Sequence, residues 1–195
     1  MGKVQENKIN KHNRLMEAAY ALYTHKGFAD TTISDIVKDA GTAKGTFYLY
    51  FKDKYDIQEK LIARKAKQLF THAKECSGYE DKEDIPGKIL AIIDDILEQL
   101  KDNKLLLKFI NKNLSWGLFK KVMEDSDESY VTFLEEIIGD TVNDTETRLC
   151  IYTIFEMVGA TVHNVILYSD PVDFETYKPY LHKSVRAVMA EFQIQ

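Results

Sequence analysis

The sequence is poor in the residues that mark several classes of protein. Its 195 residues include only three prolines and nine glycines, which excludes collagen-like and low-complexity chains. The two cysteines, Cys76 and Cys150, lie far apart and form no C-x-x-C pair, so neither a disulfide framework nor a cysteine zinc site is indicated. We expect both thiols to be reduced and to lie in or near helices.

Long apolar runs are also absent. No such run approaches the roughly 20 residues that a membrane-spanning helix needs. Residues 1–13 are polar and lack the apolar core of a signal peptide. The composition, 45% apolar and 29% charged, is that of an ordinary globular protein. We predict a cytoplasmic protein without a membrane partner, built as one domain or as a small domain joined to a larger one.

Motifs of the common enzyme classes are missing. No nucleophile elbow, P-loop or dinucleotide-binding fingerprint occurs. The adjacent acids Asp94 and Asp95 do not face each other on a helix, and the same holds for Glu135 and Glu136, so solvated surfaces are favoured over catalytic pairs. The histidines show no H-x-x-x-H or H-E-x-x-H spacing. We predict no enzymatic activity, no cofactor and no metal site.

The net charge of −5 hides an asymmetry between the two ends of the chain. Residues 1–74 hold 14 basic and 8 acidic residues, a net charge of +6. Residues 75–195 hold 12 basic and 23 acidic residues, a net charge of −11. A basic first third favours contact with a polyanion, although chance clustering on a solvated surface would look the same.

The apolar spacing is helical along nearly the whole chain. A first helix carries Leu15, Ala19 and Leu22 and should end at Gly27. No stretch alternates long enough to predict a strand, so the fold class is all-α. Further helices are predicted from Thr32 to Gly41, after Thr42, from Asp53 to Cys76, from about Pro86 to Leu100, around 105–110, from Ser126 to Ile138, from Asn143 to about Tyr168, and from Phe174 to Phe192 with Pro179 in or near the first turn.

Two short helices joined by a glycine turn form a helix-turn-helix pattern between Thr32 and Phe51. Thr32 and Asp35 have the spacing of a capping box, and Gly41 should end the first helix. The second helix of such a pair enters the major groove with its N-terminal residues on the base edges. Phe47 and Phe51 should lie in the core of this unit.

The run of residues 31–54 closely resembles the signature of the tetracycline-repressor (TetR/AcrR) family. Ala18-Ala19 and Lys26-Gly27-Phe28 also match, and the resemblance covers about residues 9–60. It implies a three-helix DNA-binding domain in residues 1–53 and a larger helical ligand-binding and dimerisation domain in residues 54–195, linked by helix 54–76. The end of the run is Lys44-Gly45-Thr46-Phe47-Tyr48-Leu49-Tyr50-Phe51-Lys52-Asp53-Lys54.

The resemblance also implies roles for individual residues. Thr32 and Lys54 would contact phosphates, which suits helix N-termini and lysine, and Tyr48 and Tyr50 would contact backbone phosphates or nearby bases. Position 50 often holds histidine in this family and is tyrosine here. The residues expected to face bases are Thr42, Ala43, Lys44, Gly45, Thr46 and Leu49.

The acidic remainder should supply the dimer and the effector site. The family's last two long helices pair with those of a partner, and a two-fold dimer suits two DNA half-sites. The residues expected at this interface are Tyr152, Phe155, Gly159, Val162, Ile166, Leu181, Val185, Val188, Met189 and Phe192. Candidates for an apolar effector pocket are Phe109, Trp116, Phe119, Met123, Tyr130, Phe133, Tyr152, Phe155 and His163, although a residue of this kind at helical spacing is more often plain core.

We therefore predict a sequence-specific transcriptional regulator, a homodimer that binds double-stranded operator DNA and that a small organic effector releases. One alternative keeps the fold but drops the ligand, giving an architectural or division-control factor. An all-helical enzyme and a redox sensor using Cys76 or Cys150 are the remaining alternatives.

Overall fold

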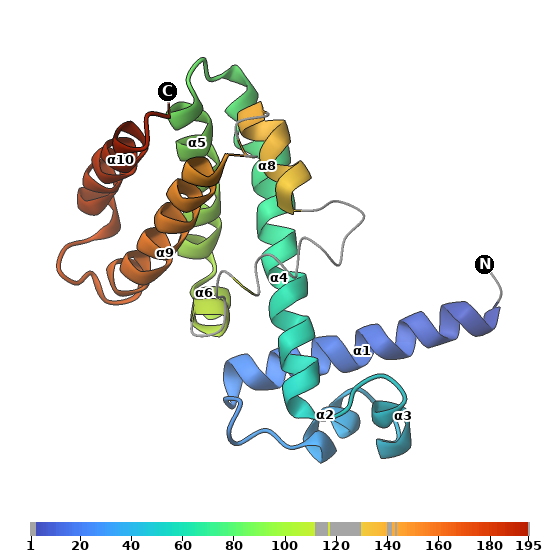
Figure 1. The fold of residues 1–195 in the computed structure, drawn as a ribbon. Helices are drawn as coiled ribbons and strands as arrows, with labels where there is room; N and C mark the ends of the chain where they lie inside the picture. The colour runs from blue at the N-terminus through green and yellow to red at the C-terminus, as the bar shows by residue number, and fades with distance from the viewer. Residues whose placement is uncertain (1–2, 112–116, 118–129, 140–141, 143, 195) are drawn as a thin grey trace. The chain divides into compact units, whose positions relative to one another are not determined.

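The computed structural model describes residues 3–111, 117, 130–139, 142 and 144–194 (Figure 1). These residues form helices and no strand, which confirms the all-α prediction. The elements in chain order are α1 (Lys3–His25), α2 (Ile33–Asp39), α3 (Lys44–Tyr48), α4 (Lys54–Cys76), the 3-10 helix η1 (Tyr79–Asp81), α5 (Ile85–Asp102), α6 (Lys104–Asn111), α8 (Tyr130–Ile138), α9 (Thr145–Tyr168) and α10 (Phe174–Glu191).

The chain divides into two compact units, residues 1–64 and 65–195, and α4 runs through the division. The bounds of α4 are those predicted for the linking helix. The assignment of DNA binding to residues 1–53, and of ligand binding and dimerisation to residues 54–195, stays a prediction.

The first unit is built around the apolar face of α1. Leu15 and Ala19 are fully buried on that face, and Phe47, Phe51 and Ile57 bury their side chains in the same unit. The burial of the two phenylalanines confirms their predicted place in the core. Short helices such as α2 and α3 are marginal alone, so this packing is what holds them in place.

The turn between α2 and α3 is a Schellman motif. The amide of Thr42 donates to the carbonyl of Val37, and that of Gly41 donates to the carbonyl of Lys38. Gly41 has φ +59°, and a Cβ there would lie 2.6 Å from Nη2 of Arg14. The positive φ favours glycine, whereas the end of the flexible Arg14 side chain could move aside, and the predicted helix stop at this position is confirmed.

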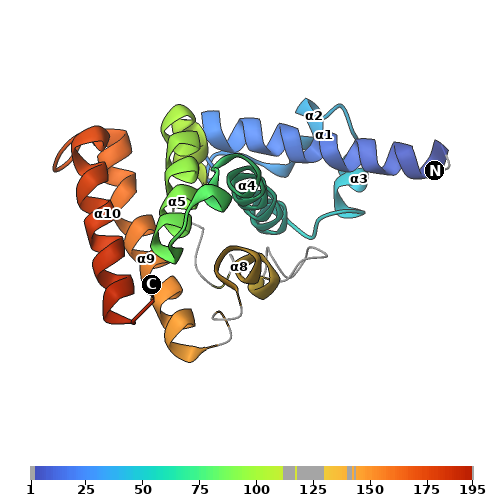
Figure 2. The same ribbon diagram turned by 90° about the horizontal axis from the view of Figure 1, so that it is seen from above.

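The second unit is a helical bundle. In it α9 packs against α6 and α10, and α5 packs against α6, α8, α10 and η1 (Figure 2). Its most deeply buried large side chains come from four helices, α5, α6, α8 and α10, and are those of Leu97, Leu107, Ile137, Leu181 and Met189. The spacing of apolar residues along each helix therefore produces one shared core.

Polar contacts connect α5 to its neighbours on two sides. Asp94 accepts from Nε2 of His182 on α10 at 2.7 Å, and Lys178 lies 3.6 Å from the same carboxylate. On the other side Asp95 lies 3.0 Å from Nδ1 of His72 on α4 and 2.6 Å from the amide of Gln99. The two adjacent acids thus contact two different helices, α10 and α4, as expected because neighbouring residues on a helix point in different directions.

Several helix ends differ from the prediction. Ala43, not Thr42, is the N-cap of α3, and no side chain caps this helix. Asp144 caps α9 by accepting from the amide of Thr147, whereas the predicted cap Asn143 lies outside the described residues. Pro179 lies inside α10, beyond its first turn, because the helix already begins at Phe174.

Candidate DNA-binding surface and apolar pocket

Thr32 anchors the start of α2 through the predicted capping box. Its hydroxyl accepts from the amide of Asp35 at 3.1 Å, and the Asp35 carboxylate accepts from the amide of Thr32 at 2.9 Å. Lys26 adds an ion pair to this carboxylate at 2.8 Å. The hydrogen bond from Lys26, followed by those from Thr32, lowers the pKa of Asp35 to about 2.

The exposed residues of α3 and its C-cap form a small surface suited to a DNA groove. Lys44 and Gly45 open the helix in exposed positions. Tyr48 is 54% exposed and Leu49 is 79% exposed, although both are large and apolar or aromatic. A lysine can donate to guanine and an aliphatic side chain can touch the thymine methyl, so this surface offers base-reading chemistry.

Several other residues that were expected to contact the DNA are buried or half-buried within the protein. The hydroxyl of Thr42 is buried and has no hydrogen-bond partner among the described residues. Tyr50 is half-buried, and its ring meets that of His12 edge to face at 5.7 Å. Ala43 is exposed and Thr46 is half-buried. Their roles at the bases or phosphates remain predictions.

Lys54 has partners inside its own unit. Its Nζ donates to the carbonyl oxygens of Phe28, Ala29 and Thr31 at 3.1, 3.2 and 3.4 Å. The same ammonium lies over the Phe28 ring, 4.5 Å from its centre. This set of contacts ties the start of α4 to the segment before α2. The predicted phosphate role therefore has a structural competitor that the sequence did not indicate.

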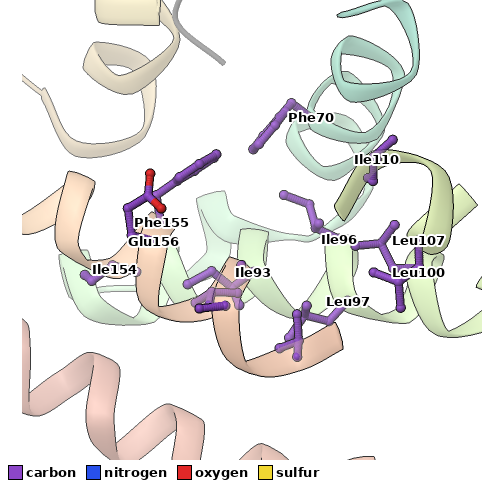
Figure 3. A pocket seen from close by; sticks show the side chains of 14 residues that line it. Phe70, Ile93, Ile96, Leu97, Leu100, Leu107, Ile110, Ile154, Phe155 and Glu156 are labelled. Carbon is purple, nitrogen blue, oxygen red and sulfur yellow. The ribbon is translucent and has the colours of Figure 1, made fainter. Parts of the chain in front are cut away.

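A cavity of about 300 Å³ lies within the second unit, between α4, α5, α6 and α9 (Figure 3). The lining residues that the structure describes are almost all aliphatic or aromatic, and Glu156 is the one charged residue among them. The side chains around it include those of Phe70, Ile93, Ile96, Leu100, Ile110 and Phe155. The volume is at the lower end of the range of about 300–1,000 Å³ that is typical of ligand sites.

Among the described residues that were predicted for an effector pocket, Phe155 alone is placed in the lining of this cavity. Phe109 and Phe133 are buried outside that lining, and Tyr152 is exposed. His163 is half-buried, with Nδ1 3.2 Å from Oδ1 of Asn164. Trp116, Phe119, Met123 and the side chain of Tyr130 lie outside the described residues.

Sequence reasoning missed the aliphatic lining of this cavity. The prediction favoured aromatic and methionine side chains, whereas the described lining residues of α5 and α6 are all isoleucine or leucine, and α9 adds aliphatic residues such as Ile154 and Val162. The signal available in the sequence was the excess of apolar residues on α5, which carries more of them than one packed face requires.

The helices expected to form the dimer show two kinds of residue. Leu181, Val185 and Met189 of α10 are fully buried within one chain, and Val162 and Ile166 of α9 are buried as well. By contrast, Tyr152 is 43% exposed, and Gly159 is exposed too. Phe155, Val188 and Phe192 are half-buried. The predicted interface thus divides into residues that stabilise one chain and residues that offer surface to a partner.

Among the described helices, α9 is the one whose length and composition would also suit a membrane span. Its best 18-residue window has a mean hydropathy of 1.4 and is 33% buried. A single helix of this kind is weak grounds for a membrane segment, since core helices of globular proteins have the same properties. The finding does identify apolar surface on α9 that one chain leaves uncovered.

The two thiols have different environments. Cys76 is exposed at the end of α4, and Cys150 is buried in α9. Burial raises the pKa of Cys150 to about 11, which keeps this thiol protonated and unreactive at neutral pH. Neither cysteine forms a disulfide.

Comparison with known proteins agrees with the helix-turn-helix geometry. A sequence profile described as "Bacterial regulatory proteins, tetR family" matches residues 15–61. The HTH-type transcriptional regulator YvdT of Bacillus subtilis is 31% identical over 138 residues, which are 70% of this chain and 69% of that protein. The chain thus has the fold and sequence of a helix-turn-helix regulator, and it belongs to the tetR family of bacterial regulatory proteins.

Solved structures share the fold at lower identity. A TetR-family transcriptional regulator from Streptomyces coelicolor has a TM-score of 0.71 and 16% identity, covering 93% of this chain and 99% of that one. The regulator FadR from Bacillus subtilis, solved in complex with stearoyl-CoA, has a TM-score of 0.64 and 21% identity, covering 89% and 97%. The protein is a DNA-binding transcriptional regulator of this family.

Proposed function

We propose that the protein is a repressor that leaves its operator when a small effector with a hydrocarbon chain occupies the cavity of the second unit. The apolar cavity of about 300 Å³ carries the proposal. A site with this lining binds a ligand by removing apolar surface from water, at about 25 cal/mol per Å². Relatives named as transcriptional regulators support a regulatory rather than an enzymatic role in the cytoplasm.

The chemistry of the lining defines the class of effector. Among the described lining residues none is basic, and Glu156 is exposed. The cavity therefore suits an aliphatic chain, and any anionic head group would lie outside it. The bound stearoyl-CoA of the Bacillus subtilis FadR makes acyl-CoA thioesters the first compounds to test.

The functional unit is proposed to be a homodimer formed through α9 and α10. Leu149 is 51% exposed on α9, on the same face as Tyr152 and Gly159. A second copy covers this apolar face, and the small residues Gly159 and Ala160 permit close approach of the helices. Two DNA-binding units per dimer then read two half-sites.

Occupation of the cavity affects DNA binding through the distance between the two DNA-binding units. Phe70 on α4 lines the cavity, and the same helix begins at Lys54 in the first unit. A ligand that fits better when α4 is displaced shifts the population away from the spacing that the operator requires.

The test measures thermal unfolding and DNA binding with the same compounds. The probes are octanoyl-, lauroyl-, palmitoyl- and stearoyl-CoA, with free CoA as the control for the head group. The DNA is the duplex upstream of the protein's own gene, or a duplex selected from a random library. Ligand at about 100 times its Kd should stabilise the fold by about 2.7 kcal/mol, so at least one chain length should raise the melting temperature and release the DNA.

Two variants test whether the ligand acts by binding in the cavity. Ile96→Trp fills the cavity, whereas Leu105→Trp adds the same side chain at an exposed position of α6. The ligand response should disappear in Ile96→Trp and persist in Leu105→Trp, while both variants still bind DNA. Failure of every acyl compound to change the melting temperature or the DNA affinity would refute the proposal and favour a factor that binds DNA without an effector.

A further inference from the structure

The N-terminal half of α1 extends beyond the core of the first unit. From Leu15 onward the helix buries an apolar face, but residues 6–11 are all exposed. These six exposed residues precede the first inward contact at His12 and span about 9 Å of helix. Exposed helix that packs against no described part of the unit gains little stability from burial, so its side chains are available for a partner.

This extension is basic. Residues 3–14 hold Lys3, Lys8, Lys11 and Arg14 against one acid, Glu6. Neither Lys8 nor Lys11 has an ion pair or hydrogen bond with any residue that the structure describes. Two unneutralised lysines one helical turn apart present a local positive charge to solvent.

The two lysines lie on the face of α1 that packs against the rest of the unit. Lys11 precedes Leu15 by four residues and Lys8 precedes it by seven, spacings that place all three on one side of a helix. Glu6 falls on the opposite side. The inward face of α1 therefore continues past the core as a basic face.

The basic face of α1 begins beside the end of the helix-turn-helix. His12 stacks on Phe51 with 5.1 Å between ring centres and meets Tyr50 at 5.7 Å, which places α1 beside the end of α3. Both ribbon views show α3 beside the N-terminal half of α1 (Figures 1 and 2). Side chains on a helix lean toward its N-terminus, so those of Lys8 and Lys11 lean away from the core that begins at Leu15.

We propose that Lys8 and Lys11 bind backbone phosphates of the operator duplex outside the contacts of the helix-turn-helix. The inference rests on the DNA-binding function of the first unit and adds to it a flanking, sequence-independent contact on each DNA-binding unit. Phosphate contacts from lysine position a protein on DNA and release counterions.

The test compares Lys8→Gln/Lys11→Gln with Lys67→Gln/Lys82→Gln, which removes the same charge from exposed lysines of the second unit. Glutamine keeps the helix propensity of lysine, and circular dichroism checks the fold. Loss of two phosphate contacts should reduce the slope of log affinity against log salt by about 1.8 per DNA-binding unit. Between 50 and 200 mM salt, the affinity ratio of wild type to variant should therefore shrink about twelvefold for each DNA-binding unit that is bound.

Duplex length provides the second readout. Trimming base pairs outside the helix-turn-helix footprint should weaken the wild type and the control pair, and should leave Lys8→Gln/Lys11→Gln unaffected. An unchanged salt slope together with equal sensitivity to trimming would overturn the inference, while specific binding of the full duplex would keep the DNA-binding function intact. A lower melting temperature with an unchanged slope would also overturn it, since the lysines would then act on folding.

Discussion

The ammonium of Lys54 lies 3.1 Å from the carbonyl oxygen of Phe28 and 4.5 Å from the centre of its ring. This pair joins the first residue of α4 to the segment that leads into α2. The hydroxyl of Tyr23 donates to the carbonyl of Lys54 at 2.9 Å and attaches the same point to α1. Lys54 therefore fixes the geometry of the helix-turn-helix from inside the protein.

Lys54→Ala should destabilise the first unit by about 1–2 kcal/mol, because carbonyl oxygens lose a charged donor. DNA affinity should fall on every sequence with little change in the salt slope. Lys52→Ala, at an exposed neighbouring position, serves as the control. Thermal unfolding and a salt series of binding titrations measure both effects. A slope reduced by about 0.9 at unchanged stability would instead assign Lys54 to a phosphate.

Lys44→Ala should change sequence preference rather than overall affinity. The residue is exposed at the start of α3, where a lysine reaches a base edge in the major groove. A contact to guanine predicts a loss of about 1–3 kcal/mol of discrimination at one base pair. Titration of operator duplexes with single base-pair changes tests this, with Lys38→Ala as the control. Equal weakening on all duplexes would place Lys44 at a phosphate.

The capping box predicts an acid-dependent stability of the first unit. Hydrogen bonds from Lys26 and Thr32 lower the pKa of Asp35 from 3.8 to about 2. A depressed folded-state pKa means that the stabilisation is present above pH 3.8 and is lost as the pH falls through about 2. The melting temperature of wild type should exceed that of Asp35→Asn at pH 5, and this difference should shrink by pH 2. Asp39→Asn, at an exposed position of the same helix, should show no such convergence.

The exposed face of α9 predicts the oligomeric state. Leu149→Arg/Tyr152→Arg places two charges where a second copy is proposed to pack, and an unpaired charge in an apolar interface is costly. The variant should sediment as a monomer and bind an operator half-site without cooperativity. Leu105→Arg, exposed on α6, should remain a dimer. A wild type that is monomeric at all concentrations would contradict the proposed interface.

Local rules explain which parts of the structure were predictable. The bounds of α4, the capping box at Thr32 and the stop at Gly41 follow from capping residues, glycine and helical periodicity within a few residues of each position. The burial of Phe47 and Phe51 follows from the same periodicity. The predicted start of α3 was wrong. Thr42 is a better N-cap type than Ala43, but it is the last residue of the Schellman turn, and α3 begins after Ala43.

The candidate sites were less predictable because they depend on contacts distant in sequence. The cavity joins Phe70, Ile96, Leu107 and Phe155 from four helices, and no local pattern indicates which apolar residues leave space between them. Lys54 reaches Phe28 across 26 positions, so its carbonyl partners were invisible to motif analysis. Burial of Met189 within one chain likewise follows from how α10 packs, not from its apolar spacing.

The most direct test of the account is the coupling between effector and DNA. Fluorescence anisotropy gives the DNA affinity without ligand and at saturating acyl-CoA, and the ligand affinity is then measured without and with DNA. Effector release predicts a reduction in DNA affinity of about 5–150-fold, and linkage demands the same factor in the ligand affinity. A ligand that binds the cavity but leaves the DNA affinity unchanged would contradict the account.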